Sequence, residues 1–133
     1  MSEYLFVYGT LARNVGHEMH KHLVRHADYA GQGTFNGILY CVAHYPGATA
    51  SSNPDDVVHG ELYGLRDADA LFAALDPYES CGPDDPKPTK YVRVTATIHK
   101  PGGEAVTAWI YLYNRDVSAL ARIASGRFIG GQL

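Results

Sequence analysis

Tyr4-Leu5-Phe6-Val7-Tyr8-Gly9-Thr10-Leu11 is the stretch of sequence that decides the fold. Its first five residues are aromatic or aliphatic and include neither Pro nor Gly, which predicts a buried strand over residues 3–8. Gly9 ends this strand, because a glycine lets the backbone turn and lets another group approach the main chain. The amides of Gly9, Thr10 and Leu11 could then point at an anion as a small nest. A plain strand end followed by a turn explains the same residues equally well.

The composition is that of a globular protein. The chain has 133 residues, which suits a single domain over residues 1–133. Its 46% hydrophobic and 19% charged residues argue against disorder. A net charge of -3 gives no electrostatic case for nucleic acid or an anionic membrane as a partner. The ten tyrosines suit a small-molecule pocket, because each offers an apolar face and a polar tip.

Targeting signals and cysteine pairs are not found in the sequence. No stretch is long and apolar enough to span a bilayer, and the N-terminal Met1-Ser2-Glu3-Tyr4 does not resemble a signal peptide, so we expect a cytoplasmic protein. Cys41 and Cys81 do not make a disulfide framework and are expected to be free thiols. Because neither cysteine belongs to a Cys-x-x-Cys pair, a zinc ribbon is excluded.

Histidines are concentrated in a short helix that we predict over residues 14–27. His17 and His20 are one residue too close for the zinc-protease motif, in which the two histidines lie one helical turn apart. The pair His22 and His26 does lie one turn apart, but a solvated polar helix face explains it equally well. We predict neither a metal site nor a cofactor.

Strands are expected through most of the remaining chain. Between residues 29 and 42 we predict two strands with a turn at Asn36-Gly37, a dipeptide that favours hairpins. Tyr45-Pro46-Gly47-Ala48 predicts a type II turn. Three further strands are predicted, of which the last two form a hairpin, at residues 57–65, 91–99 and 104–113.

Helices are expected at two further places. Asp67 is a good N-cap for a helix over residues 68–75, and Asp76-Pro77 is expected to stop that helix. The Pro- and Asp-rich loop 82–89 suits a lid, and residues 116–124 suggest a last short helix. Together the elements indicate an α+β protein with a mixed, strongly bent, barrel-like sheet and a few peripheral helices.

Several short motifs, taken in order, resemble those of the gamma-glutamylcyclotransferase-like superfamily, and most closely its gamma-glutamylamine cyclotransferase branch. The resemblance extends from Phe6 to Phe128, and its specificity lies in the order and spacing of the motifs rather than in any one of them. The motifs are Phe6–Leu11, Tyr45–Gly47, Val57–Tyr63, Leu75–Glu79, Tyr91–Val94 and Ala108–Tyr113. Ser125–Phe128 resembles the closing Gly-Asp-aromatic turn of the family, with Arg127 in place of the acid.

The resemblance implies a cofactor-independent reaction. The α-amine of a small gamma-glutamyl substrate attacks its own γ-carbonyl, which releases 5-oxoproline and a free amine or amino acid. Leu75-Asp76-Pro77-Tyr78-Glu79 resembles the Leu-Asp-x-x-Glu-Gly segment of the family, which implies that Glu79 is the catalytic acid/base. Ser80-Cys81-Gly82 follows where the family has Gly directly. The substrate-binding residues expected with Glu79 are Tyr8, Gly9, Thr10, Leu11, Tyr45 and Tyr91.

Other functions stay open at this level. Cys81 could act as a nucleophile with His44 or His59 as its base, although no Cys/His signature surrounds it. The same fold could also bind a small metabolite without turning it over, or serve as an interaction module. The motifs leave the leaving amine unspecified, and both a monomer and a homodimer are compatible with the sequence.

Overall fold

The computed structural model describes residues 3–9, 20–43, 45–79 and 89–128. No helix in these ranges is both long and apolar enough to cross a membrane. The elements, in chain order, are β1 (Tyr4–Val7), α1 (His20–His26), β2 (Ala27–Cys41), β3 (Pro46–Ala50), β4 (Val57–Leu65), α2 (Ala68–Tyr78), β5 (Tyr91–His99), β6 (Ala105–Tyr113) and β7 (Ala121–Arg122).

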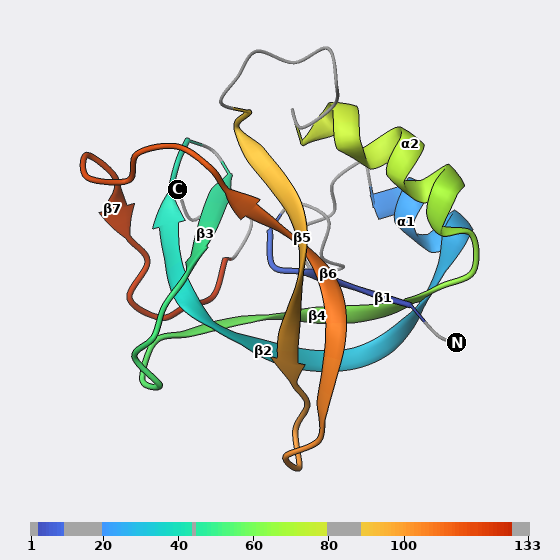
Figure 1. Ribbon diagram of the computed structural model, residues 1–133, viewed down its shortest axis with the longest axis horizontal. Helices are drawn as coiled ribbons and strands as arrows, with labels where there is room; N and C mark the ends of the chain where they lie inside the picture. The colour runs from blue at the N-terminus through green and yellow to red at the C-terminus, as the bar shows by residue number, and fades with distance from the viewer. Residues whose placement is uncertain (1–2, 10–19, 44, 80–88, 129–133) are drawn as a thin grey trace.

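Five strands close into a barrel in the order β2-β4-β1-β6-β5 (Figure 1), and β5 pairs again with β2. Strand β1 is antiparallel to β4 and parallel to β6, so the sheet is mixed. Strands β3 and β7 pair with the second half of β2, outside the ring. The predicted α+β class with a barrel-like, mixed sheet is confirmed.

The β1 strand is central because its two faces supply two different cores. Side chains alternate along a strand, so Leu5 and Val7 point to the outer face while Phe6 and Tyr8 belong to the cluster inside the barrel. All four side chains are buried. The predicted strand at the start of the chain is therefore confirmed.

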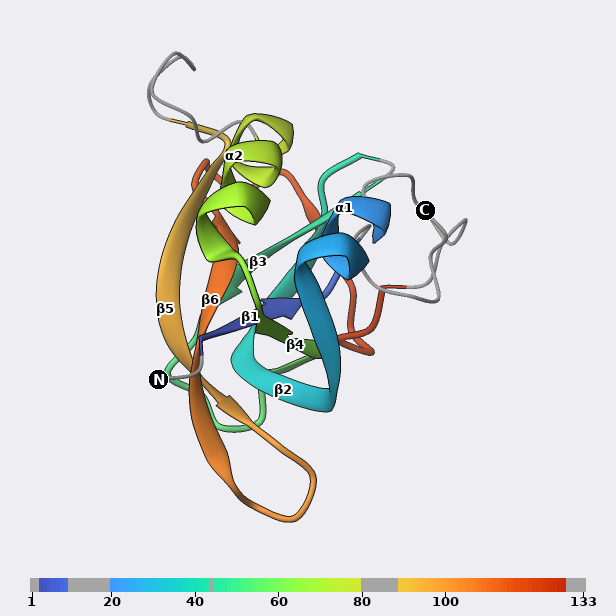
Figure 2. The same ribbon diagram turned by 90° about the vertical axis from the view of Figure 1, so that its right-hand side faces the viewer.

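Both helices cover the outer face of the barrel next to each other, as Figure 2 shows from the side. Helix α2 begins where Asp67 accepts a hydrogen bond from the amide of Ala70 at 3.1 Å, which confirms the predicted N-cap. Its Leu71 and Leu75 are fully buried against Leu5 and Val7 of the same cluster. This packing fixes the C-terminal end of α2 at one end of the barrel.

The predicted turn at Asn36-Gly37 is wrong, because β2 runs unbroken through both residues. A Cβ atom on Gly37 would lie 2.4 Å from the carbonyl oxygen of Thr49, so this glycine serves the close approach of β3. The Asn36 amide group donates to the carbonyls of Asn53 and Asp56, at 2.7 Å each, instead of forming a turn.

Three smaller predictions also need correction. Pro46 and Gly47 lie in β3 rather than in a type II turn, with Pro46 as the first residue of the strand, where its missing N–H is tolerated. Pro77 lies inside α2 and does not stop it, because the amide of Glu79 still bonds to the carbonyl of Leu75 at 2.8 Å. Residues 116–124 contain turns and the short strand β7 in place of a helix.

Candidate active site

Glu79 follows directly on α2 and caps its C-terminal end. The residue is half-buried. Burial raises the pKa of its carboxyl group from 4.5 to about 8, Lys90 acts to lower that pKa, and Asp76 acts to raise it further. A carboxyl group with such a pKa changes protonation state close to physiological pH, which an exposed glutamate does not do.

Tyr91 lies close to Glu79 and to three other tyrosines, and we call these five residues the tyrosine–glutamate cluster: Tyr8, Tyr45, Tyr91, Tyr113 and Glu79. Burial above all, and then the charges of the other four members, keeps the pKa of Tyr91 well above its ordinary value. Burial and then Glu79 raise the pKa of Tyr8 in the same way, against a hydrogen bond from Ala48. Both phenols therefore stay neutral at physiological pH.

Hydrogen bonds to the backbone hold these tyrosines in place. The Tyr8 hydroxyl donates to the carbonyl of Tyr111 and accepts from the amide of Ala48 at 3.2 Å. The Tyr91 hydroxyl donates to the carbonyl of Pro46 at 2.6 Å. Each hydroxyl proton is thus committed to the protein, and the Tyr8 oxygen also accepts a bond already, so these two side chains offer a substrate apolar rings and no hydrogen-bond donor.

The structure brings together Glu79, Tyr8, Tyr45 and Tyr91 from the set expected on sequence grounds. Gly9 lies nearby, because a Cβ atom on it would come within 3.0 Å of the Pro46 ring. The remaining positions lie outside the described residues, so their predicted roles stay predictions: Thr10, Leu11, His44, Cys81 and residues 82–88 of the expected lid.

Two members of this region were not singled out from the sequence. Lys90 donates a hydrogen bond to the Tyr45 hydroxyl, and its ammonium lies 4.5 Å from the centre of the Tyr45 ring. Tyr113 pairs with Tyr91 across β5 and β6, with ring centres 5.6 Å apart and ring planes at 76°. Cross-strand register would have found Tyr113, whereas no pattern marks a single lysine that precedes a strand.

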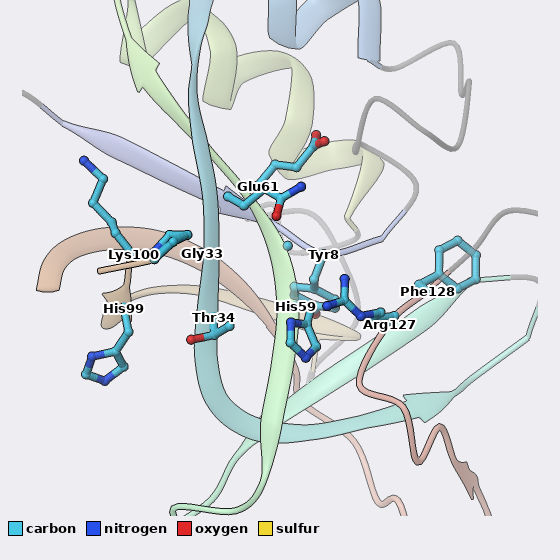
Figure 3. A pocket seen from close by; sticks show the side chains of 12 residues that line it. Tyr8, Gly33, Thr34, His59, Glu61, His99, Lys100, Arg127 and Phe128 are labelled. Atoms are coloured by element: carbon cyan, nitrogen blue, oxygen red, sulfur yellow. The ribbon is translucent and has the colours of Figure 1, made fainter. Parts of the chain in front are cut away.

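A pocket beside this cluster takes in Tyr8 but not Glu79 (Figure 3). It has a volume of about 460 Å³ and is lined in part by residues of β2 and β4, where His59 pairs with Thr34. His59 lies beside Arg127, and burial together with that guanidinium lowers the His59 pKa. His59 therefore lines this pocket, and it is not a member of the tyrosine–glutamate cluster.

Comparison with known proteins gives the family of the chain. Residues 5–129 match the family described as gamma-glutamyl cyclotransferase, AIG2-like. The chain belongs to this family. Among curated relatives of the cyclotransferase family, it is 33% identical over 126 residues to the gamma-glutamylcyclotransferase family protein YtfP of Escherichia coli strain K12, and the match covers 94% of this chain and 95% of that protein.

Solved structures share the fold of this chain. An AIG2-like protein from Mus musculus matches with a TM-score of 0.68 at 24% identity, over 91% of this chain and 85% of that one. YkqA from Bacillus subtilis matches with a TM-score of 0.71 at 22% identity, over 96% of this chain but only 40% of that longer chain. At these identities the likeness shows the fold alone.

Proposed function

We propose that the protein is a gamma-glutamyl cyclotransferase that converts a small gamma-glutamyl compound into 5-oxoproline and a free amine or amino acid. One observation carries the proposal: Glu79, the residue implied by the family motif, is a shielded carboxyl group with a pKa of about 8, and it is close enough to Tyr8 and Tyr91 to raise the pKa of both phenols. The family membership supports the same reaction class.

The reaction needs proton transfer more than it needs a nucleophile from the protein. The substrate's α-nitrogen attacks the γ-carbonyl carbon, the ring closes, and the amide bond to the leaving nitrogen breaks. Between ammonium substrate and ammonium product, the α-nitrogen loses two protons and the leaving nitrogen gains two, so the reaction releases no net proton. One carboxylate placed between the two nitrogens can carry these protons, a contribution of about 10²- to 10⁴-fold in rate.

The pKa of Glu79 suits this exchange. A carboxylate with an ordinary pKa is too weak a base to take a proton from an amine that is mostly protonated at neutral pH. Burial raises the pKa of Glu79 to about 8, which brings it near that of the substrate's amine, and proton transfer is most efficient when the two values are close. Tyr8 and Tyr91 are buried close to this carboxyl group, and we expect their rings to shield it from water and to help hold the substrate folded for attack.

Release of 5-oxoproline from a panel of gamma-glutamyl amines and amino acids tests the proposal. We expect release by the wild type and a loss of at least 10²-fold in kcat for Glu79→Gln. Glu61→Gln, which changes a carboxylate on β4 outside the tyrosine–glutamate cluster, is the matched control and should retain activity. Release that survives in Glu79→Gln but is lost in Glu61→Gln would move the proton transfer to β4 and contradict the proposal.

Two further experiments distinguish the proposed reaction from a cysteine nucleophile, a binding protein and an interaction module. Cys81→Ser should leave cyclisation intact, whereas a cysteine nucleophile would make this variant inactive. If no compound is turned over by folded protein, the rise in melting temperature with each compound decides between a binding protein and an interaction module. A ligand that binds only the native state must stabilise it.

A further inference from the structure

Three neighbouring strands carry a row of polar side chains outside the tyrosine–glutamate cluster. Thr34 of β2 pairs with His59 of β4 on one side and with His99 of β5 on the other, and we call these three residues the polar row. Residues opposite each other in antiparallel strands point to the same side of the sheet, with Cβ atoms about 4.5–5.5 Å apart. The adjacent Phe35 and Val58 belong to the cluster inside the barrel, so the polar row points away from that cluster.

A tight turn places Arg127 at one end of the polar row. The amide of His59 donates to the carbonyl of Gly126 at 2.8 Å, which ties the turn to β4. Gly126 has a φ of +68°, and a Cβ atom on it would clash with the carbonyl oxygen of Val57, so this position requires glycine. The Arg127 side chain consequently lies beside His59, with Thr34 between His59 and His99, as Figure 3 shows. The turn thus presents a guanidinium where the similar turn of the family has an acid.

The charges around the polar row favour an anion. Arg127 is exposed, and its guanidinium makes no hydrogen bond or ion pair with any residue that the structure describes. Lys100 directly follows His99 and lines the same pocket. Of the described residues that line this pocket, Glu61 alone carries a carboxylate, and it accepts a hydrogen bond from the Tyr63 hydroxyl at 2.9 Å. Two cationic side chains therefore face one carboxylate, which leaves an excess of positive charge even when both histidines are neutral.

We propose that this pocket binds a phosphate group, either free or carried by a small metabolite, through Arg127 and the polar row. The guanidinium fork can donate to two phosphate oxygens. The Thr34 hydroxyl, for which the described residues provide no hydrogen-bond partner, can donate to a third. A carboxylate has only two oxygens and one charge, so it uses fewer of these donors. The pocket volume of about 460 Å³ leaves room for an organic group, and Tyr8 and Phe128 line the pocket as apolar surfaces for it.

Isothermal titration calorimetry with glycerol 3-phosphate, inorganic phosphate and glycerate tests this inference. Glycerol 3-phosphate and glycerate share a three-carbon frame, but one ends in a phosphate and the other in a carboxylate. We expect the wild type to bind glycerol 3-phosphate at least about 10-fold more tightly than glycerate. Arg127→Met should weaken this binding by about 10- to 100-fold, and Thr34→Val, which keeps the shape of the side chain, by about 3- to 10-fold. Arg25→Met removes the same charge from an exposed position of α1, so it is the control and should bind as the wild type does.

The possible outcomes separate a phosphate site from its alternatives. An equal loss in Arg127→Met and Arg25→Met would show only the effect of net charge and overturn the inference. Equally tight binding of glycerate, or no binding of either phosphate compound to the wild type, would overturn it too. Tighter binding of glycerol 3-phosphate than of inorganic phosphate would identify an ester as the ligand, and equal binding would identify free phosphate; either result supports the site.

This inference does not rest on the proposed function. Glu79→Gln should lose 5-oxoproline release and still bind glycerol 3-phosphate as tightly as the wild type, so the two proposals can fail separately. Equal melting temperatures of the unliganded wild type, Arg127→Met and Thr34→Val would show that a loss of binding is not caused by unfolding.

Discussion

Asp76 and Arg93 form a two-pronged ion pair, with Nε of Arg93 3.0 Å from one carboxylate oxygen and a terminal nitrogen 3.2 Å from the other. Both side chains are about one-quarter exposed, at 25% and 27%. The Arg93 guanidinium also lies over the rings of Phe72 and Trp109, at 3.9 and 4.8 Å from their centres. The pair ties the last turn of α2 to β5, three residues before Glu79.

Asp76→Asn should shift the pH profile of kcat/KM as well as lower it. The negative charge of Asp76 raises the Glu79 pKa, so its removal should lower that pKa and move the acid limb to lower pH. The variant keeps the shape of the side chain but weakens the ion pair, and we expect a destabilisation of about 1–3 kcal/mol in urea unfolding. A lower rate with an unmoved acid limb would show that Asp76 only holds α2 in place.

Asp28→Asn is the matched control for that measurement. Asp28 pairs with Arg66 at 3.2 Å, but the two side chains are 73% and 51% exposed. Water screens such a pair, so its loss should change the free energy of unfolding by less than about 1 kcal/mol and leave the pH profile unchanged.

Glu79→Gln should change the pH dependence of stability. The folded-state pKa of about 8 lies above the unfolded value of 4.5, so the protonated carboxyl group is the form that the fold favours. The contribution of Glu79 to the stability of the wild type is therefore complete below about pH 4.5 and is lost as the pH rises through 8. The variant lacks this loss, and we expect it to be more stable than the wild type by about 2–4 kcal/mol at pH 9 and similar at pH 4.5.

Urea unfolding of both proteins across this pH range checks the prediction. Glu104→Gln, at an exposed position just before β6, is the control and should follow the wild type. Parallel curves for Glu79→Gln and the wild type at all pH values would contradict the burial of the Glu79 carboxyl group.

Tyr8→Phe should destabilise the fold by removing one hydroxyl. The change leaves the amide of Ala48 without its hydrogen-bond partner and the carbonyl of Tyr111 without its donor, at a buried position. We expect a cost of about 1–3 kcal/mol in thermal or urea unfolding. Tyr4→Phe in the same strand is the control, because no hydrogen bond of its hydroxyl is found among the described residues, and it should cost less than about 0.5 kcal/mol.

Two glycines of β4 test how closely β1 packs against this strand. A Cβ atom on Gly60 would lie 2.3 Å from the carbonyl oxygen of Val7 and 2.7 Å from the Phe6 ring, whereas one on Gly64 would meet nothing closer than 3.9 Å. Gly60→Ala should therefore cost about 3 kcal/mol or more, because backbone atoms cannot move aside. Gly64→Ala should be neutral or slightly stabilising. Equal effects in urea unfolding would contradict the close approach of β1 to β4.

Patterns that depend on neighbouring residues predicted the fold well. The uninterrupted apolar run from Tyr4 to Tyr8 and the Asp67 cap both correspond to what the structure shows. The Asn36-Gly37 dipeptide misled for a physical reason. It signals a turn only when nothing else needs a glycine, and here β3 lies so close that a side chain at residue 37 would meet Thr49. Information of that kind comes from a distant segment and is not contained in a dipeptide.

The residues of the candidate site also differ in whether neighbouring or distant parts of the chain reveal them. Family motifs pointed to Glu79 and Tyr91, because each motif is a short continuous stretch. Lys90 carries no such signal, since its neighbourhood is set by Tyr45, which lies 45 residues away in the chain. The raised pKa of Glu79 likewise depends on burial by several elements at once, so the sequence can suggest the residue but not its protonation behaviour.

The parallel pairing of β1 with β6 has a consequence for how the chain is made. Strand β1 is synthesised before the other strands of the barrel, yet one of its two neighbours, β6, and the hydrogen-bond partner of Tyr8, 103 residues further along the chain, are synthesised much later. Until then one edge of β1 stays open and the barrel cannot close. The growing chain must therefore carry an apolar strand with one unpaired edge until β6 has been made, which exposes Leu5, Phe6 and Val7 to aggregation during synthesis.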